Sequence, residues 1–345
     1  MSWLPGRALV LGLARSGEAA ALALRERGVE VVGVDRSAEL DAGRLAAAGV
    51  EVRLGNEEVS LLDGVELLVK SPGVRGDAPL VRAARERGVP VWSEVELGVR
   101  LLDRPLVGVT GTNGKTTTTE LLGAMFRAAG RPVEVAGNVG RALTSVALEG
   151  ELPAEAWIVC ELSSFQLEDI ETLRPRVGLL LNLEPDHLDR HGSLEAYRAA
   201  KLRLFENQEA EDRAVLPRGF GAVPGAGQRI EFDASDPLPA EPRIPGAHNR
   251  ENAAAATAAA RAAGLDDASI AEALRSFPGV PHRLELVAEL AGVRYVNDSK
   301  ATNAAAARRG IAAYDAPLHL ILGGSRKGED FSELAASLPV SVRSI

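Results

Sequence analysis

The 345-residue chain contains a single cysteine, and only five of its 39 basic residues are lysine. One cysteine, Cys160, excludes a disulfide framework and favours a reducing compartment. No apolar run is long enough to span a membrane. The first 17 residues do not form a signal peptide, because their apolar run is short and leads directly into a glycine turn. We therefore expect a cytoplasmic protein without a membrane-inserted segment.

Acidic residues outnumber basic ones, 48 to 39, so the formal net charge is −9. This balance argues against a general nucleic-acid or membrane-surface role, although a local basic cleft can still bind a small anionic substrate. Arginine supplies the ordinary positive charge here. Each lysine is therefore a candidate for a role that needs a compact ammonium or a nucleophilic amine, with codon bias as the alternative. The five are Lys70, Lys115, Lys201, Lys300 and Lys327.

The chain opens with the pattern of a nucleotide-binding α/β unit. An apolar strand over 7–12 leads into a glycine turn, an alanine-rich helix and a second strand that ends on Asp35. The third glycine of the dinucleotide fingerprint is absent, since Ala20 stands where it would fall. The pattern predicts a Rossmann-like first domain and leaves an NAD-dependent oxidoreductase open as an alternative.

Two further boundaries divide the chain. Asp103, Arg104 and Pro105 interrupt a helix before a fresh strand, and the stretch "FPGVPHR" precedes the last segment. Between them, apolar strands alternate with helices, which predicts an α/β fold with a mostly parallel sheet. The last segment predicts a strand from 293, a helix, a strand from 318 and another helix. We expect domains at 1–103, 104–281 and 282–345.

A phosphate-binding loop is predicted where the second domain begins. Residues 110–117, "TGTNGKTT", place a glycine-containing loop and Lys-Thr between a strand and a helix, which points backbone N–H groups and a helix N-terminus at phosphate. Lys115 would reach the β- and γ-phosphates, and the Thr116 hydroxyl would bind Mg²⁺. Val109 stands where the strict pattern has glycine, so this is a compact variant. A chance glycine turn is the alternative.

Polar side chains follow two more strands of the same predicted sheet. Glu161 lies at the end of "AWIVCE", where open α/β sheets bind ligands, and a carboxylate there suits Mg²⁺. His187 follows the next strand with acids beside it, which suggests a second Mg²⁺ site. A water-facing acid and a hydrogen-bonding histidine are the structural alternatives.

Several stretches resemble a known family. "GTNGKTT" resembles the ATP loop of the Mur ligases and folylpolyglutamate synthetases, which form amide bonds through acyl phosphates. "ELSSFQL", "YRAAK", "VPHR" and "NDSKATN" resemble the D-glutamate-adding branch of the Mur ligases, over the whole chain. The resemblance implies three domains: a Rossmann-like UDP-binding domain, a P-loop ATPase-like central domain and a Rossmann-like C-terminal domain.

The resemblance also assigns roles to individual residues. It implies that Lys201 is carbamylated by CO₂ and helps position Mg²⁺, with a solvated helix lysine as the alternative. The implied ATP site comprises Gly111, Thr112, Asn113, Gly114, Lys115, Thr116, Thr117, Asn252, Arg283 and Asp298. The implied UDP-substrate site comprises Ser16, Asp35, Arg36, Ser37, Ser71, Asn138 and His187, and the implied D-glutamate site comprises Lys300, Thr302 and Lys327. Lys115, Asn138, His187, Lys201 and Lys300 are the implied catalytic residues.

The implied reaction is ATP-dependent addition of D-glutamate to UDP-N-acetylmuramoyl-L-alanine in peptidoglycan precursor synthesis, by a monomer with two Mg²⁺ sites. One departure matters: the last domain is about half the length typical of the family, and the missing part carries a further D-glutamate contact. The alternative is therefore a truncated form that binds ATP and the UDP-substrate without turnover.

Overall fold

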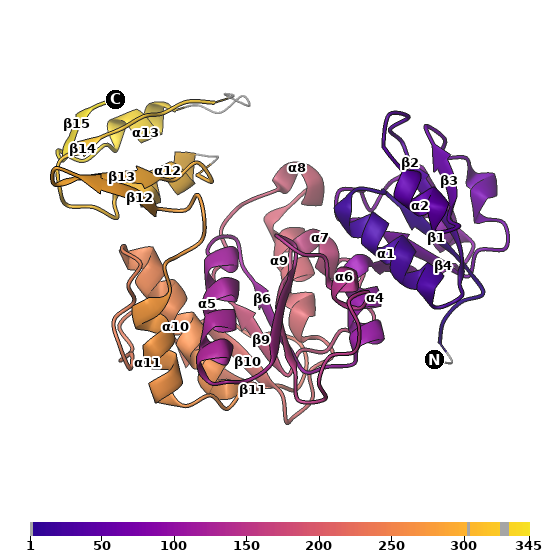
Figure 1. The fold of residues 1–345 in the computed structure, drawn as a ribbon, viewed down its shortest axis with the longest axis horizontal. Coiled ribbons are helices and arrows are strands. Elements are labelled where there is room, and N and C mark those ends of the chain that lie inside the picture. Colours follow the sequence, from indigo (N-terminus) through magenta and orange to yellow (C-terminus); the bar gives the residue numbers. More distant parts are fainter. Residues whose placement is uncertain (1–2, 302–303, 325–330) are drawn as a thin grey trace. The chain divides into compact units, whose positions relative to one another are not determined.

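The computed structural model describes residues 3–301, 304–324 and 331–345 (Figure 1). The chain divides into two compact units, Met1–Lys115 with Gly130–Glu231, and Thr116–Ala129 with Phe232–Ile345. Within the described residues, no helix is both long and apolar enough to cross a bilayer. The predicted domain boundaries at 103 and 281 remain predictions, since these units divide the chain differently.

The first unit begins with a five-stranded parallel sheet in the order β3-β2-β1-β4-β5. This is the strand order of a Rossmann-type sheet, as predicted. Its strands are Arg7–Leu11 (β1), Glu30–Asp35 (β2), Glu51–Leu54 (β3), Leu67–Lys70 (β4) and Val91–Ser93 (β5). Its helices are Arg15–Glu26 (α1), Gly43–Ala47 (α2), Val59–Leu62 (η1, 3₁₀), Pro79–Glu86 (α3) and Glu94–Leu102 (α4).

The strands of this sheet are apolar on both faces because helices cover both sides. Ala8 and Val10 belong to one core, with α1 and α4, whereas Leu9 and Leu11 belong to a second core, with η1 and α3. Successive side chains of a strand point to opposite faces, so a strand covered on both sides must be a continuous apolar run. This is why "RALVL" could be recognised as a buried strand.

Helix α4 carries a buried acid that holds a distant loop. The carboxylate of Glu96 accepts hydrogen bonds from the backbone N–H groups of Glu171, Thr172 and Leu173 at 2.9–3.0 Å. It also accepts one from the Thr172 hydroxyl and one from Arg100, both at 2.7 Å. Burial alone would raise the pKa of Glu96, but these donors prevail and lower it.

Replacing Glu96 with alanine is expected to lower the free energy of unfolding by about 3–5 kcal/mol, because several buried N–H and O–H donors lose their acceptor and the partly buried Arg100 loses one of its two carboxylate partners. Urea unfolding at pH 7 measures this. The difference should shrink as the pH falls through the lowered pKa of Glu96, where protonation weakens the same bonds in the native protein. Glu86→Ala, at an exposed position of α3, is the matched control and should change stability by less than about 0.5 kcal/mol.

The second sheet has six strands in the order β11-β10-β9-β6-β8-β7. Pairs from β10 through β7 are parallel, as predicted for a central ATP-binding domain. Its strands are Leu106–Thr110 (β6), Val133–Gly137 (β7), Trp157–Glu161 (β8), Val177–Leu180 (β9), Arg213–Pro217 (β10) and Gln228–Phe232 (β11). Helices of this region are Leu143–Val146 (α6), Ser164–Leu167 (α7), Leu188–His191 (α8), Leu194–Leu202 (α9) and Arg203–Phe205 (η2, 3₁₀).

The second unit contains three longer helices, Lys115–Ala128 (α5, from Thr116 on), Ala247–Ala262 (α10) and Asp267–Ser276 (α11). Helix α10 forms because nine of its residues are alanine, the strongest helix former. The helix starts after its N-cap Gly246 (φ 100°), and the Asn249 amide donates to the carbonyl of Pro245 at 2.6 Å.

Within the described residues, the last segment forms two separate two-stranded sheets. Glu285–Leu290 (β12) and Val293–Asn297 (β13) pair as an antiparallel hairpin, and Leu318–His319 (β14) pairs in parallel with Val342–Ser344 (β15). The helices here are Ala304–Ile311 (α12) and Ser332–Ala336 (α13). The apolar run from Leu318 predicts a longer strand, but a strand extends only as far as its partner, and β15 has three residues.

Candidate active site

The predicted strand–loop–helix arrangement is present at residues 110–117. Strand β6 ends at Thr110 and α5 begins at Lys115, with Gly111 at φ 152° and Gly114 at φ 84°. A side chain at Gly111 would place its Cβ 2.9 Å from the Cβ of Leu181, so the loop requires glycine there. The Lys115 ammonium folds back over the loop and donates to the carbonyls of Gly111 and Thr112, both at 3.0 Å.

Asn182, two residues after β9, binds the backbone of this loop. Its Oδ1 accepts from the N–H groups of Thr112 at 3.1 Å and Asn113 at 2.8 Å, and its Nδ2 donates to the carbonyl of Asn113 at 3.1 Å. Asn182 is not among the residues predicted from the sequence. Its position could have indicated it, since it follows β9, which pairs with β6. The side chain of Glu184 adds a contact by accepting from the Asn113 amide at 2.9 Å.

Glu161 ends β8, the strand on the other side of β6, and is almost completely buried. Its Oε1 accepts from the Asn138 amide at 3.0 Å, and its backbone carbonyl accepts from the Asn138 N–H at 2.9 Å. A Cβ at Gly137 would lie 2.2 Å from that carbonyl, so only glycine permits the approach. The structure thus brings together two of the predicted site residues, Glu161 and Asn138.

The donor set around Glu161 fits a magnesium ion that is shared with a nucleotide. Among the residues that the structure describes, no three His, Cys, Asp or Glu side chains form a metal-binding group. Mg²⁺ does not require such a group, because it commonly takes one or two carboxylates and fills its remaining positions with water and substrate phosphates. A single buried carboxylate at a strand end beside a phosphate loop matches this mode.

Lys201 on α9 points into the same loop. Its side chain is 2% exposed, and its Nζ donates to the carbonyl of Gly111 at 2.7 Å. Burial, with Lys115 adding repulsion, lowers the pKa of Lys201 to about 7, although Asp186 and Glu161 oppose this. A large share of its amine is therefore neutral near pH 7, as carbamylation requires. The solvated-lysine alternative is wrong, because the side chain is buried.

Tyr197, one turn before Lys201, completes the support of the loop. Its hydroxyl lies 3.1 Å from the Thr112 hydroxyl, which also donates to the carbonyl of Glu184 at 3.1 Å. Burial raises the pKa of Tyr197 to about 12, so it stays a neutral hydrogen-bonding group.

His187 lies in the loop after β9, but it is half exposed. It adopts a left-handed backbone conformation (φ 51°), and its Nε2 lies 3.5 Å from Asp186. The more buried histidine is His191, which is not among the residues predicted from the sequence. Its Nε2 lies 2.9 Å from the Ser164 hydroxyl and its Nδ1 lies 3.2 Å from Glu168. Burial, with repulsion from Arg190, lowers the pKa of His191.

Three of the predicted UDP-site residues lie at the glycine turn that follows β1. Asp35 accepts from the N–H groups of Leu13 at 2.7 Å and Ser37 at 2.9 Å, and the Ser71 hydroxyl donates to the carbonyl of Gly12 at 2.7 Å. The structure therefore uses both oxygens of the Asp35 carboxylate to shape the turn. Ser16 lies partly exposed in α1, and Arg36 is exposed after β2.

The predicted residues of the second unit lie as follows. Thr116 and Thr117 are nearly buried in the first turn of α5, and Asn252 is buried in α10. Asp298 follows β13 and accepts from the Leu284 N–H at 3.1 Å. Burial raises the pKa of Asp298, and the nearby charge of Arg283 opposes this. Lys300 is exposed, and Thr302 and Lys327 lie outside the described residues.

The chain is similar to proteins of one family along almost all of its length. Residues 109–220 match the Mur ligase middle domain, and residues 6–93 match the N-terminal domain of MurD-like Mur ligases. UDP-N-acetylmuramoylalanine–D-glutamate ligase of Acidobacterium capsulatum is 41% identical over 98% of this chain and 81% of its own length. The enzyme of the same name from Pelotomaculum thermopropionicum is 43% identical over 95% of this chain and 79% of its own length.

Solved structures agree on the fold. UDP-N-acetylmuramate–alanine ligase MurC from Thermotoga maritima is 21% identical over 89% of this chain and 77% of its own, with a TM-score of 0.55. MurF from Acinetobacter baumannii is 20% identical over 90% of this chain and 72% of its own, with a TM-score of 0.56. The oxidoreductase alternative loses its support, and the chain belongs to the UDP-N-acetylmuramoylalanine–D-glutamate ligase branch of the Mur ligase family.

Proposed function

We propose that this chain joins D-glutamate to UDP-N-acetylmuramoyl-L-alanine at the expense of ATP. The observation that carries the proposal is the convergence of two lysines on one carbonyl of the phosphate loop. The Nζ atoms of Lys115 and Lys201 lie 3.0 and 2.7 Å from the Gly111 oxygen. Positive charge so placed favours phosphate oxygens, and the acid of Glu161 on the adjacent strand suits the metal that accompanies them.

The reaction has two steps. A carboxylate oxygen of the UDP-substrate attacks the γ-phosphorus of ATP, and ADP leaves as an acyl phosphate forms. The amine of D-glutamate then attacks the acyl carbon, inorganic phosphate leaves, and the nitrogen loses a proton as the amide forms. Lys115 would hold the transferring phosphoryl group, Asn138 would orient the acceptor, and Asn182 would keep the loop in shape. Bound Mg²⁺ would neutralise charge on the phosphates.

Several finer assignments belong to the same proposal and rest on the family relationship. They are a carbamate on Lys201, two Mg²⁺ sites with Thr116 and His187 among the ligands, and nucleotide contacts from Asn252, Arg283 and Asp298. Recognition of D-glutamate by Lys300, Thr302 and Lys327 also belongs here. So do a monomeric state, a cytoplasmic location and the three domains 1–103, 104–281 and 282–345. The low pKa and burial of Lys201 support the carbamate most directly.

A second candidate is a form that binds ATP and the UDP-substrate without turnover. It is favoured by the C-terminal segment, where β12 and β13 expose apolar side chains; Leu286, Val287 and Val293 are each more than half exposed. Exposed apolar surface of this kind marks an interaction site or an aggregation-prone region. The chain also spans about four fifths of the length of its relatives, since it covers 81% of the A. capsulatum enzyme.

Phosphate release from ATP separates the two candidates. The assay contains UDP-N-acetylmuramoyl-L-alanine with and without D-glutamate, and L-glutamate, L-alanine and diaminopimelate replace D-glutamate in parallel. Release that requires D-glutamate supports the ligase. Binding of ATP and the UDP-substrate by calorimetry without release supports the second candidate. Absence of binding to either ligand would contradict both.

A further inference from the structure

Lys70 is the one lysine that the predicted site does not include. It is the last residue of β4, and its side chain is completely buried. The turn that begins with Ser71 follows at once, and the Ser71 hydroxyl donates to the glycine turn at Gly12. Lys70 therefore stands directly beneath the loop that we propose to contact the UDP-substrate.

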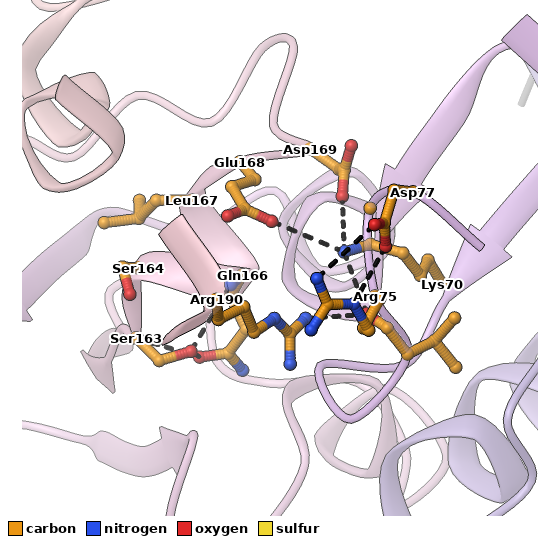
Figure 2. A network of polar contacts seen from close by, with 12 residues as sticks. Lys70, Arg75, Asp77, Ser163, Ser164, Gln166, Leu167, Glu168, Asp169 and Arg190 are labelled. Atoms are coloured by element: carbon orange, nitrogen blue, oxygen red, sulfur yellow. Dashed lines mark hydrogen bonds and ion pairs between the residues drawn. The ribbon is translucent and has the colours of Figure 1, made fainter. Parts of the chain in front are cut away.

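The partners of Lys70 come from far along the chain. Its Nζ lies 2.8 Å from the carboxylate of Asp169 and 3.7 Å from that of Glu168, as Figure 2 shows. Both acids follow α7, the short helix that comes after the strand of Glu161. The Asp169 carboxylate also accepts from Arg85 at 2.6 Å, and its backbone carbonyl accepts from the N–H of Ser93 at 2.8 Å. Lys70 of β4, Arg85 of α3 and the Ser93 N–H of β5 thus all bind Asp169, two residues after α7.

The turn after Lys70 is held from the other side as well. The carbonyl of Val74 accepts from Lys70 at 3.4 Å and from Arg190 at 2.7 Å. The Arg190 guanidinium lies 3.7 Å from the ring centroid of Phe165 on α7. Arg190 is three residues after His187. One carbonyl of the turn therefore receives donors from β4 and from α8, the helix that begins directly after His187.

We propose that Lys70 is a positioning residue: it fixes the 71–74 turn against α7, so that the UDP-substrate is held in register with the phosphoryl-transfer site. This rests on the proposed function. A buried ion pair is weak evidence for stability, because well-packed apolar residues often stabilise as much. Here the ion pair lies directly beside the turn that would position the UDP-substrate. A shift of about 1 Å between reacting groups lowers rates by about 100-fold.

The test compares Lys70→Met, Asp169→Asn and the double variant by steady-state phosphate release. Lys70→Met is expected to raise KM for the UDP-substrate about tenfold or more and to lower kcat, while KM for ATP changes less than about twofold. Lys70→Met alone leaves two acids without their ammonium and will lower Tm. The double variant removes one of these acidic charges and should regain Tm, yet keep the raised KM.

Glu171→Gln is the matched control. Glu171 lies two residues after Asp169, where it accepts from Trp92 at 2.7 Å and from Arg100 at 3.0 Å, and neither of these contacts involves the 71–74 turn. Its KM for the UDP-substrate should stay at the wild-type value. A double variant that regains both Tm and KM would overturn the proposal, because Lys70 would then act only through stability. Wild-type protein without D-glutamate-dependent release would instead refute the proposed function.

Discussion

Lys201→Met is expected to lower kcat for D-glutamate-dependent phosphate release by about a thousandfold, the loss typical of removing a key electrostatic group. The Lys201 side chain is buried against the phosphate loop, and its amine reacts with CO₂ only when neutral. The lowered pKa of about 7 supplies that neutral form at physiological pH. The carbamate would place a negative charge where Glu161 and the phosphate loop would hold Mg²⁺. Steady-state kinetics at saturating substrates measure the loss.

Three controls make the Lys201 result interpretable. Lys201→Arg should be as inactive as Lys201→Met, because a guanidinium stays protonated and does not form the carbamate. Arg198→Met removes an exposed cation from the same helix and should change kcat by less than about twofold. Removal of CO₂ from the buffer should lower the wild-type rate, and bicarbonate should restore it. An active Lys201→Arg variant would contradict the carbamate.

The same lysine should leave a signature in stability. Its folded-state pKa of about 7 lies below the ordinary value of 10.5, so between these values the unfolded chain binds the extra proton. In CO₂-free buffer, wild-type stability should therefore rise as the pH increases from 7 to 10.5. The Lys201→Met variant has no buried amine to protonate. Its free energy of unfolding should therefore exceed that of the wild type most at pH 6, and the difference should shrink toward pH 10.

The fold could be predicted wherever local pattern and global packing agree. The five-stranded sheet is covered on both faces, so its strands form unbroken apolar runs, and the turns between them carry glycine. The carboxyl ends of parallel strands meet at one edge, which is why Lys115, after β6, and Glu161, at the end of β8, could be predicted at the same edge of the sheet. The strand length in the last segment could not be predicted in this way, because an apolar run such as "LHLILGG" does not specify whether a partner strand is present.

The missed residues share a different cause. Glu96 and Asp169 have the composition of solvent-facing acids, and only the fold buries them, beside donors that lie more than 70 residues away in the sequence. Asn182 looks like any amide after a strand until the loop of Thr112 and Asn113 folds against it. Lysine scarcity marked Lys70 as unusual but could not name its partners. Long-range polar contacts of this kind carry no periodicity, so sequence pattern does not reveal them.

Lys115→Met is expected to lower kcat/KM for ATP by about a thousandfold or more, because the ammonium would meet negative charge that develops on the transferring phosphoryl group. The structure positions it for this: the Nζ lies over the loop, 3.0 Å from each of two backbone carbonyls that fix its direction. Lys115→Arg should recover little of the loss, since a planar guanidinium is larger than the compact ammonium that the loop encloses.

Arg127→Met, an exposed cation in the last turn of the same helix, is the matched control and should keep kcat/KM within about twofold of the wild type. Thermal melting separates lost chemistry from lost folding, because Lys115 is only partly buried and its replacement should shift Tm little. If Lys115→Met kept a tenth of the activity, the loop at 110–117 would not hold the transferring phosphate. The two lysines at Gly111 would then have only a structural role, and the phosphoryl-transfer site would have to be sought elsewhere.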